Sequence, residues 1–81
     1  MNSEKLRELE ELKTKAEFFY SQMYVCKSYE LKDFKDDASS CLSQALVIAE
    51  ELELSHEVKL LQERSEHVRN IYNQLNLPSR R

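Results

Sequence analysis

Residues 38–52, ASSCLSQALVIAEEL, carry the clearest structural signal in the chain, because their apolar side chains recur at alternating intervals of three and four residues. This spacing places those side chains on one face of an α-helix, which has about 3.6 residues per turn. The predicted buried face consists of Ala38, Cys41, Leu42, Ala45, Ile48, Ala49 and Leu52. Because alanine is small, we expect Ala45 to lie at a close contact with another helix.

The segments on both sides of this helix show the same spacing. We predict helices over about residues 4–32, 34–52 and 56–75, with Ser3, Asp33 and Ser55 as N-caps. The first helix has a core stripe of Leu9, Leu12, Ala16, Phe19, Met23 and Cys26. The third has a core stripe of Val58, Leu61, Ser65, Val68, Tyr72 and Leu75, broadened by Leu60 and Ile71.

The connections between these helices are at most about three residues long, so consecutive helices should be antiparallel neighbours. The sequence therefore predicts an all-α, antiparallel up-down-up three-helix bundle. A single domain would span residues 1–76, and a flexible tail would follow at 77–81. The alternative is a helical hairpin completed by dimerisation. The first helix is predicted to be longer than the second, so its first turns, with Leu6, Leu9 and Leu12, should overhang.

Composition supports a small helical protein. The chain has 81 residues, no glycine and a single proline, so tight turns of the kind found in β-hairpins are disfavoured. Its net charge of −3 comes with scattered Lys and Arg residues, which argues against nucleic acid as a partner. No apolar run approaches the ~20 residues of a membrane span, and no secretory signal is present. We expect a soluble protein of the cytoplasm or the nucleus, without membrane insertion.

No catalytic, metal-binding or cofactor-binding pattern stands out, so we expect no enzyme, metal or cofactor. His56 and His67 lie eleven residues apart on one predicted helix. This places them ~16 Å apart along the axis, too far to share one zinc ion. Cys26 and Cys41 occupy core-stripe positions and may be regarded either as inert small apolar residues or as a redox pair; we expect reduced, inert thiols.

A second apolar set lies on the first predicted helix. Phe18, Val25 and Tyr29 are separated by seven and four residues and therefore align, roughly opposite the leucine and alanine stripe. Gln22 lies between them and offers a hydrogen-bonding group. Either the two neighbouring helices bury this set, or it remains exposed as a contact surface for another polypeptide.

Residues 16–52 resemble a single tetratricopeptide-type helical hairpin. Val25-Cys26-x-x-Tyr29 stands where that family often has Leu-Gly-x-x-Tyr, and Ala38, Leu42 and Ala45 stand at its usual small and apolar positions. Cys26 departs from the family's small residue, and no second repeat follows.

The whole chain also resembles a microtubule-interacting-and-trafficking (MIT) domain, a three-helix bundle of about this size. The stretch Arg64-Ser65-Glu66-His67-Val68 is similar to a motif in the third helix of that family. The resemblance implies binding of short helical or extended peptide tails in grooves beside the third helix. It would place the interface around Leu60, Arg64, His67 and Ile71.

Together, these patterns predict a protein–protein interaction module that holds a partner helix or peptide in an apolar groove. The expected partner is another protein, through its helix or peptide tail, or a second copy of the chain. The alternative function is a structural homo-oligomerisation domain, in which the exposed apolar stripes close a homodimer.

Overall fold

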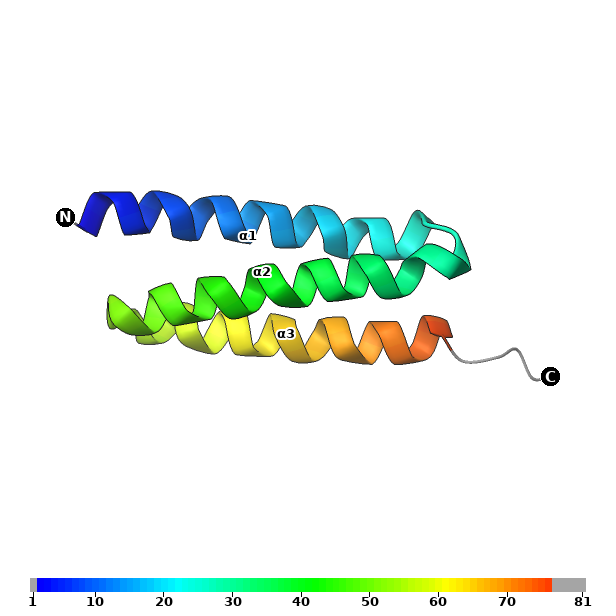
Figure 1. Cartoon of the computed structure of the whole chain (residues 1–81). Coiled ribbons are helices and arrows are strands. Elements are labelled where there is room, and N and C mark those ends of the chain that lie inside the picture. Colours follow the sequence, from blue (N-terminus) through cyan, green and yellow to red (C-terminus); the bar gives the residue numbers. More distant parts are fainter. Residues whose placement is uncertain (1, 77–81) are drawn as a thin grey trace.

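The computed structural model describes residues 2–76, which form three long helices joined by two short connections (Figure 1). The helices are α1 (Asn2–Val25), α2 (Leu31–Glu51) and α3 (Ser55–Asn76), with a short 3-10 helix, η1 (Ser28–Glu30), before α2. Within these residues there is no strand, and the predicted all-α three-helix bundle is confirmed. The tail predicted at 77–81 lies outside the described residues.

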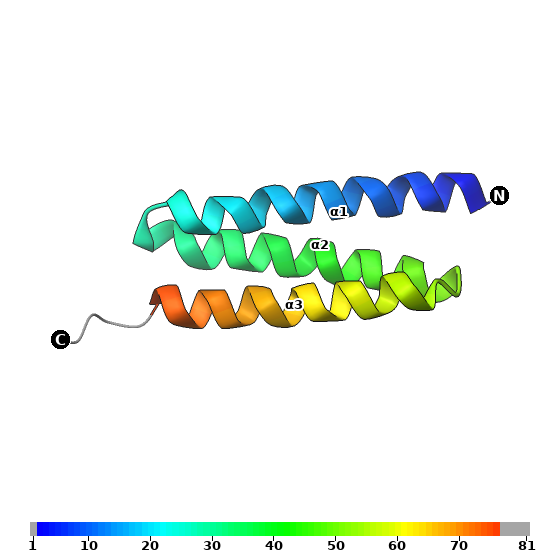
Figure 2. The same ribbon diagram turned by 180° about the vertical axis from the view of Figure 1, so that it is seen from behind.

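The middle helix, α2, holds the bundle together. It packs along both α1 and α3, whereas the backbones of α1 and α3 approach each other closely at few points. Successive helices run in opposite directions, so α1 and α3 are parallel and lie on either side of α2 (Figures 1 and 2). A groove lies between α1 and α3, and α2 contributes Leu42 to its lining.

The core is built from the stripes that the sequence predicts, and α2 contributes most of it. Ala38, Ala45 and Ala49 have no exposed surface, so α2 presents small residues where its two neighbours pack. The buried residues of the core are Leu9, Leu12, Ala16, Met23, Leu31, Ala38, Cys41, Leu42, Ala45, Ile48, Ala49, Leu61 and Val68. Leu75, predicted to be in the third stripe, is instead exposed near the end of α3.

The first helix is shorter than predicted. It ends at Val25 rather than near residue 32, because Lys27 adopts an extended conformation with φ −75° and ψ 155°. The Glu30 side chain accepts a hydrogen bond from the Lys27 backbone N–H at 3.1 Å and stabilises this turn. The next helix then begins at Leu31, whose side chain is buried in the core.

The earlier turn changes the register of the hairpin, and the predicted overhang of α1 is wrong. Leu9 and Leu12 are buried because α2 extends back beside the first turns of α1. The Lys5 Nζ atom lies 2.6 Å from a Glu51 carboxylate oxygen at the end of α2. Only Leu6 of the three leucines is exposed. The three predicted N-caps are wrong, because Ser3, Asp33 and Ser55 all lie within the first turns of α1, α2 and α3. The Leu54 carbonyl, one residue before Ser55, accepts the hydrogen bond from the Val58 N–H at 2.9 Å.

The second turn ends α2 without the usual glycine. Glu53 has a positive φ of 58°, the left-handed conformation. Its N–H donates to the Glu50 carbonyl at 3.1 Å, and the Leu54 N–H donates to the Ala49 carbonyl at 2.9 Å. This is the hydrogen-bond pattern of a Schellman motif, in which glycine is favoured because it lacks a Cβ.

Replacing Glu53 with glycine should therefore raise the free energy of unfolding by about 0.5–1 kcal/mol, since a non-glycine residue is disfavoured in this conformation. Urea denaturation followed by circular dichroism measures the change. Glu50→Gly is the matched control, because Glu50 lies within α2 and glycine there should lower the stability. Destabilisation by both changes would contradict the proposed role of the Glu53 conformation.

Candidate functional site

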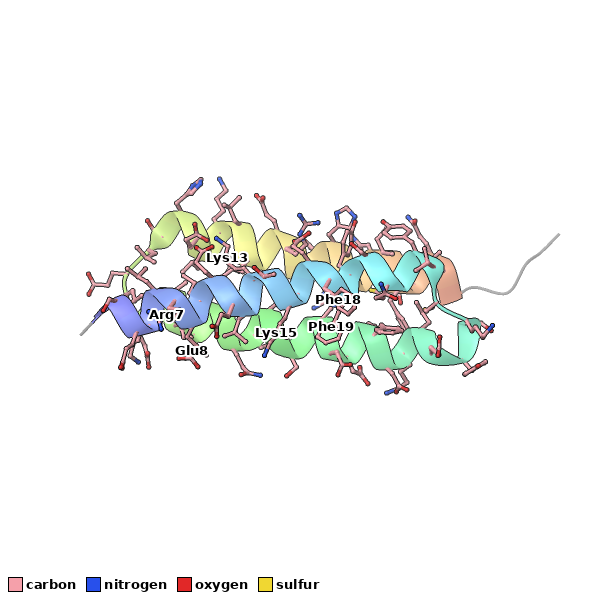
Figure 3. The ribbon with its side chains drawn as sticks, turned by 90° about the horizontal axis from the view of Figure 1, so that it is seen from above. Arg7, Glu8, Lys13, Lys15, Phe18 and Phe19 are labelled. Atoms are coloured by element: carbon pink, nitrogen blue, oxygen red, sulfur yellow. The ribbon has the colours of Figure 1, made fainter. Side chains whose placement is uncertain are left out.

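The groove between α1 and α3 is a concave surface with a volume of about 390 Å³. Residues from all three helices line it: Lys13, Glu17, Leu42, Glu57, Leu60, Leu61, Glu63, Arg64 and His67. Figure 3 shows Lys13 on the side of α1 that faces α3, whereas Phe19 lies on the side toward α2.

The base of the groove is apolar. Leu42 of α2 and Leu61 of α3 are buried in the core, and their side chains form its floor. Leu60 stands beside them and is 44% exposed. An exposed leucine next to a buried leucine floor offers apolar surface that a partner side chain can cover.

Two ion pairs cross the groove from α1 to α3. The Lys13 Nζ atom lies 2.9 Å from a Glu57 carboxylate oxygen, and the Arg64 Nε atom lies 2.9 Å from a Glu17 carboxylate oxygen. The hydrogen bond that the Lys13 ammonium donates to the Glu57 carboxylate raises the pKa of Lys13. On α3 the pairs fall on either side of Leu60 and Leu61, so they frame the apolar floor. Because they are partly exposed, each should contribute about 0–1 kcal/mol.

Next to the Arg64–Glu17 ion pair, aromatic side chains of α1 also contact α3. The Tyr20 hydroxyl lies 2.9 Å from His67 Nε2, and the two rings meet edge to face at 5.4 Å. The Arg64 guanidinium stacks over the Tyr20 ring at 4.9 Å, and the Tyr24 hydroxyl lies 3.0 Å from that of Tyr20. Burial is the main cause of the raised pKa of Tyr20, and the hydrogen bond with Tyr24 raises this pKa further. These contacts join α1 and α3 at this end of the groove.

A second, shallower hollow of about 360 Å³ adjoins the groove along α3. The two hollows share Glu63 and His67, so they form one continuous surface. The other residues of the second hollow are Glu66, Asn70, Ile71 and Gln74.

The structure brings together the predicted site residues of the third helix. Leu60, Arg64 and His67 line the groove, and the partly buried Ile71 lines the adjoining hollow. Sequence reasoning missed the opposite wall, which α1 supplies. The sequence does contain a pattern that could have predicted this wall. Lys13, Glu17, Tyr20 and Tyr24 are spaced by four, three and four residues, which places two charged and two aromatic side chains on the same face of a helix.

The apolar set predicted on the first helix, Phe18, Val25 and Tyr29, is exposed, but these residues do not lie on one face of a single helix. Phe18, Val25 and Tyr29 are 55%, 73% and 76% exposed, so the neighbouring helices do not bury them. However, α1 ends at Val25 and Tyr29 belongs to η1, so the predicted helical alignment of Tyr29 with Phe18 is wrong. Gln22 is partly buried on α1. The Phe18 ring meets the Phe19 ring edge to face, at a centroid separation of 5.5 Å.

The cysteine side chains differ in their environments. Cys41 lies in the core, and burial raises the pKa of its thiol, which disfavours the reactive thiolate. Cys26 is partly buried after the end of α1, with its Sγ atom 3.7 Å from the Met23 carbonyl oxygen. Within residues 2–76, His, Cys, Asp and Glu side chains nowhere gather in groups of three or more that could hold a metal ion.

Searches for known relatives found no matching protein-family model, curated protein or solved structure. The resemblances to tetratricopeptide hairpins and MIT domains therefore stay predictions. In the part of the chain that the structure describes, no helix has the length and apolar character needed to cross a membrane.

Proposed function

We propose that this chain is a protein-binding module that receives a helix or peptide of a partner in the groove between α1 and α3. The observation that supports this proposal most is the partly exposed Leu60 beside the buried floor of Leu42 and Leu61, in the groove between α1 and α3. The resemblance to MIT domains, which bind peptide tails beside their third helix, favours the same surface.

The length of the groove suits a short helix. Its lining residues on α3 run from Glu57 to His67, which corresponds to ~15 Å or about three helical turns. A partner helix seated there would contact α1 and α3 on the side opposite α2. Apolar side chains at intervals of three and four residues would meet the leucine floor, as in other helix-in-groove complexes.

A selection from a displayed library of helical peptides, ~15 residues long, tests this proposal. Peptides that bind the wild-type protein should bind Leu60→Asp about tenfold or more weakly, because the substitution places a carboxylate at the apolar floor. Fluorescence anisotropy measures the affinities, and circular dichroism checks that the variant stays folded.

Val47→Asp is the matched control for Leu60→Asp. Val47 is exposed on α2, so the control introduces the same charge outside the lining of the groove. The control should bind the peptides as the wild type does. Failure to select any binder, or equal weakening by both variants, would contradict the groove proposal.

A homo-oligomerisation domain is the second candidate function, and the exposure of Phe18, Val25 and Tyr29 favours it. If these side chains meet in a homodimer, Phe18→Ser combined with Tyr29→Ala should weaken association by ~2 kcal/mol or more while the monomer stays folded. Light scattering over a concentration series measures association. A wild-type protein that remains monomeric throughout would exclude this function.

A further inference from the structure

The charges around the groove are not balanced. Lys13 and Arg64 are already paired with Glu57 and Glu17 across the groove. The remaining acidic residues of the continuous surface are Glu63, which lines both hollows, and Glu66, which lines the second. Both are exposed, and neither has an ion-pair partner within residues 2–76. The groove therefore presents a negative rim beside its leucine floor.

The position of this rim relative to the floor defines a recognition pattern. Glu63 and Glu66 follow Leu60 by three and six residues on α3, one to two helical turns away. A ligand that covers Leu60 with an apolar side chain would place its next turns beside these carboxylates. A cationic side chain there would gain two attractive contacts, whereas an anionic one would be repelled.

We infer that the occupant of the groove is a basic amphipathic helix of another protein. It covers Leu60 with large aliphatic side chains and carries Lys or Arg one to two turns further along, beside Glu63 and Glu66. This inference rests on the proposed function, and it adds the chemical class of the partner. An acidic helix is disfavoured because the two cationic residues of the groove are held in ion pairs at 2.9 Å.

The experiment uses a displayed helical library with leucines on one face and with Lys, Glu or Ser equally represented at each flanking position. The wild-type protein should enrich Lys over Glu at the flanking positions, and the selected peptides should bind about fivefold more tightly than their Lys→Glu counterparts at low ionic strength. The double variant Glu63→Lys/Glu66→Lys should reverse this preference. Glu8→Lys/Glu11→Lys makes the same change of charge at exposed positions of α1 outside the groove lining and should leave the preference unaltered.

The outcomes separate this inference from the proposed function. Enrichment of Lys that is reversed only by the variant at Glu63 and Glu66 supports both. Binders that depend on Leu60 but show no charge preference, or that favour Glu, would overturn the basic partner and leave the groove function standing. No binders at all would remove both proposals. Self-association of the wild type that is lost in Leu60→Asp would assign the groove to a second copy and overturn the inference.

Discussion

Replacing Leu9 with alanine should lower the free energy of unfolding by about 2–5 kcal/mol. Leu9 is only 1% exposed and belongs to the core that α1 shares with α2. Truncation removes apolar contacts and leaves a cavity that neighbouring side chains fill only in part. Urea denaturation followed by circular dichroism measures the loss, and the large effect is expected because the core of so small a protein is thin.

Leu6→Ala is the matched control for this prediction. Leu6 lies one turn earlier on α1 and is 44% exposed, so its truncation should cost less than about 1 kcal/mol. Equally small effects at both positions would mean that the first turns of α1 project beyond the bundle. This is the arrangement expected if the first helix continued without a break to about residue 32. The comparison therefore tests the register of the α1–α2 hairpin directly.

Replacing Ala45 with leucine should destabilise the bundle by about 1–3 kcal/mol, because three additional carbon atoms must enter a packed interface. Ala45 has no exposed surface and lies in the middle of the buried face of α2. Ser43→Leu is the control, since Ser43 is exposed on the same helix and the change there should stay within about 0.5 kcal/mol. A neutral Ala45→Leu variant would mean that this face of α2 is not closely packed.

The helical stripes could be predicted from the sequence because burial on a helix imposes its own period. Ala38, Leu42, Ala45 and Ala49 repeat at intervals of four, three and four residues, and no other regular structure would place them together. The short second connection likewise defines the antiparallel pairing of α2 and α3. These features depend only on local spacing, so the fold class follows from them.

The end of α1 could not be predicted in the same way. Residues 22–32 contain neither glycine nor proline, and Cys26, three residues after Met23, continues the helical spacing beyond Val25. The turn depends instead on the contact between the Glu30 carboxylate and the Lys27 N–H, together with burial of Leu31 against the core. The second of these is a tertiary interaction, which local propensity does not report.

The candidate site was only half predictable for a related reason. Leu60, Arg64 and His67 share one side of α3, so their grouping follows from helical spacing. Which side of α1 faces them depends on how both helices are rotated about α2. The pairing of Arg64 with Glu17, 47 residues away in the sequence, is a consequence of that packing and not of any local pattern.

Nuclear magnetic resonance mapping of a selected peptide on the labelled protein tests the groove most directly. If the peptide binds in the groove, the largest chemical-shift changes should fall on the methyl groups of Leu42, Leu60 and Leu61, with intermolecular contacts from the peptide to both α1 and α3. The contradicting result would be shift changes centred on Phe18 and Val25, with the three leucine methyl groups unchanged.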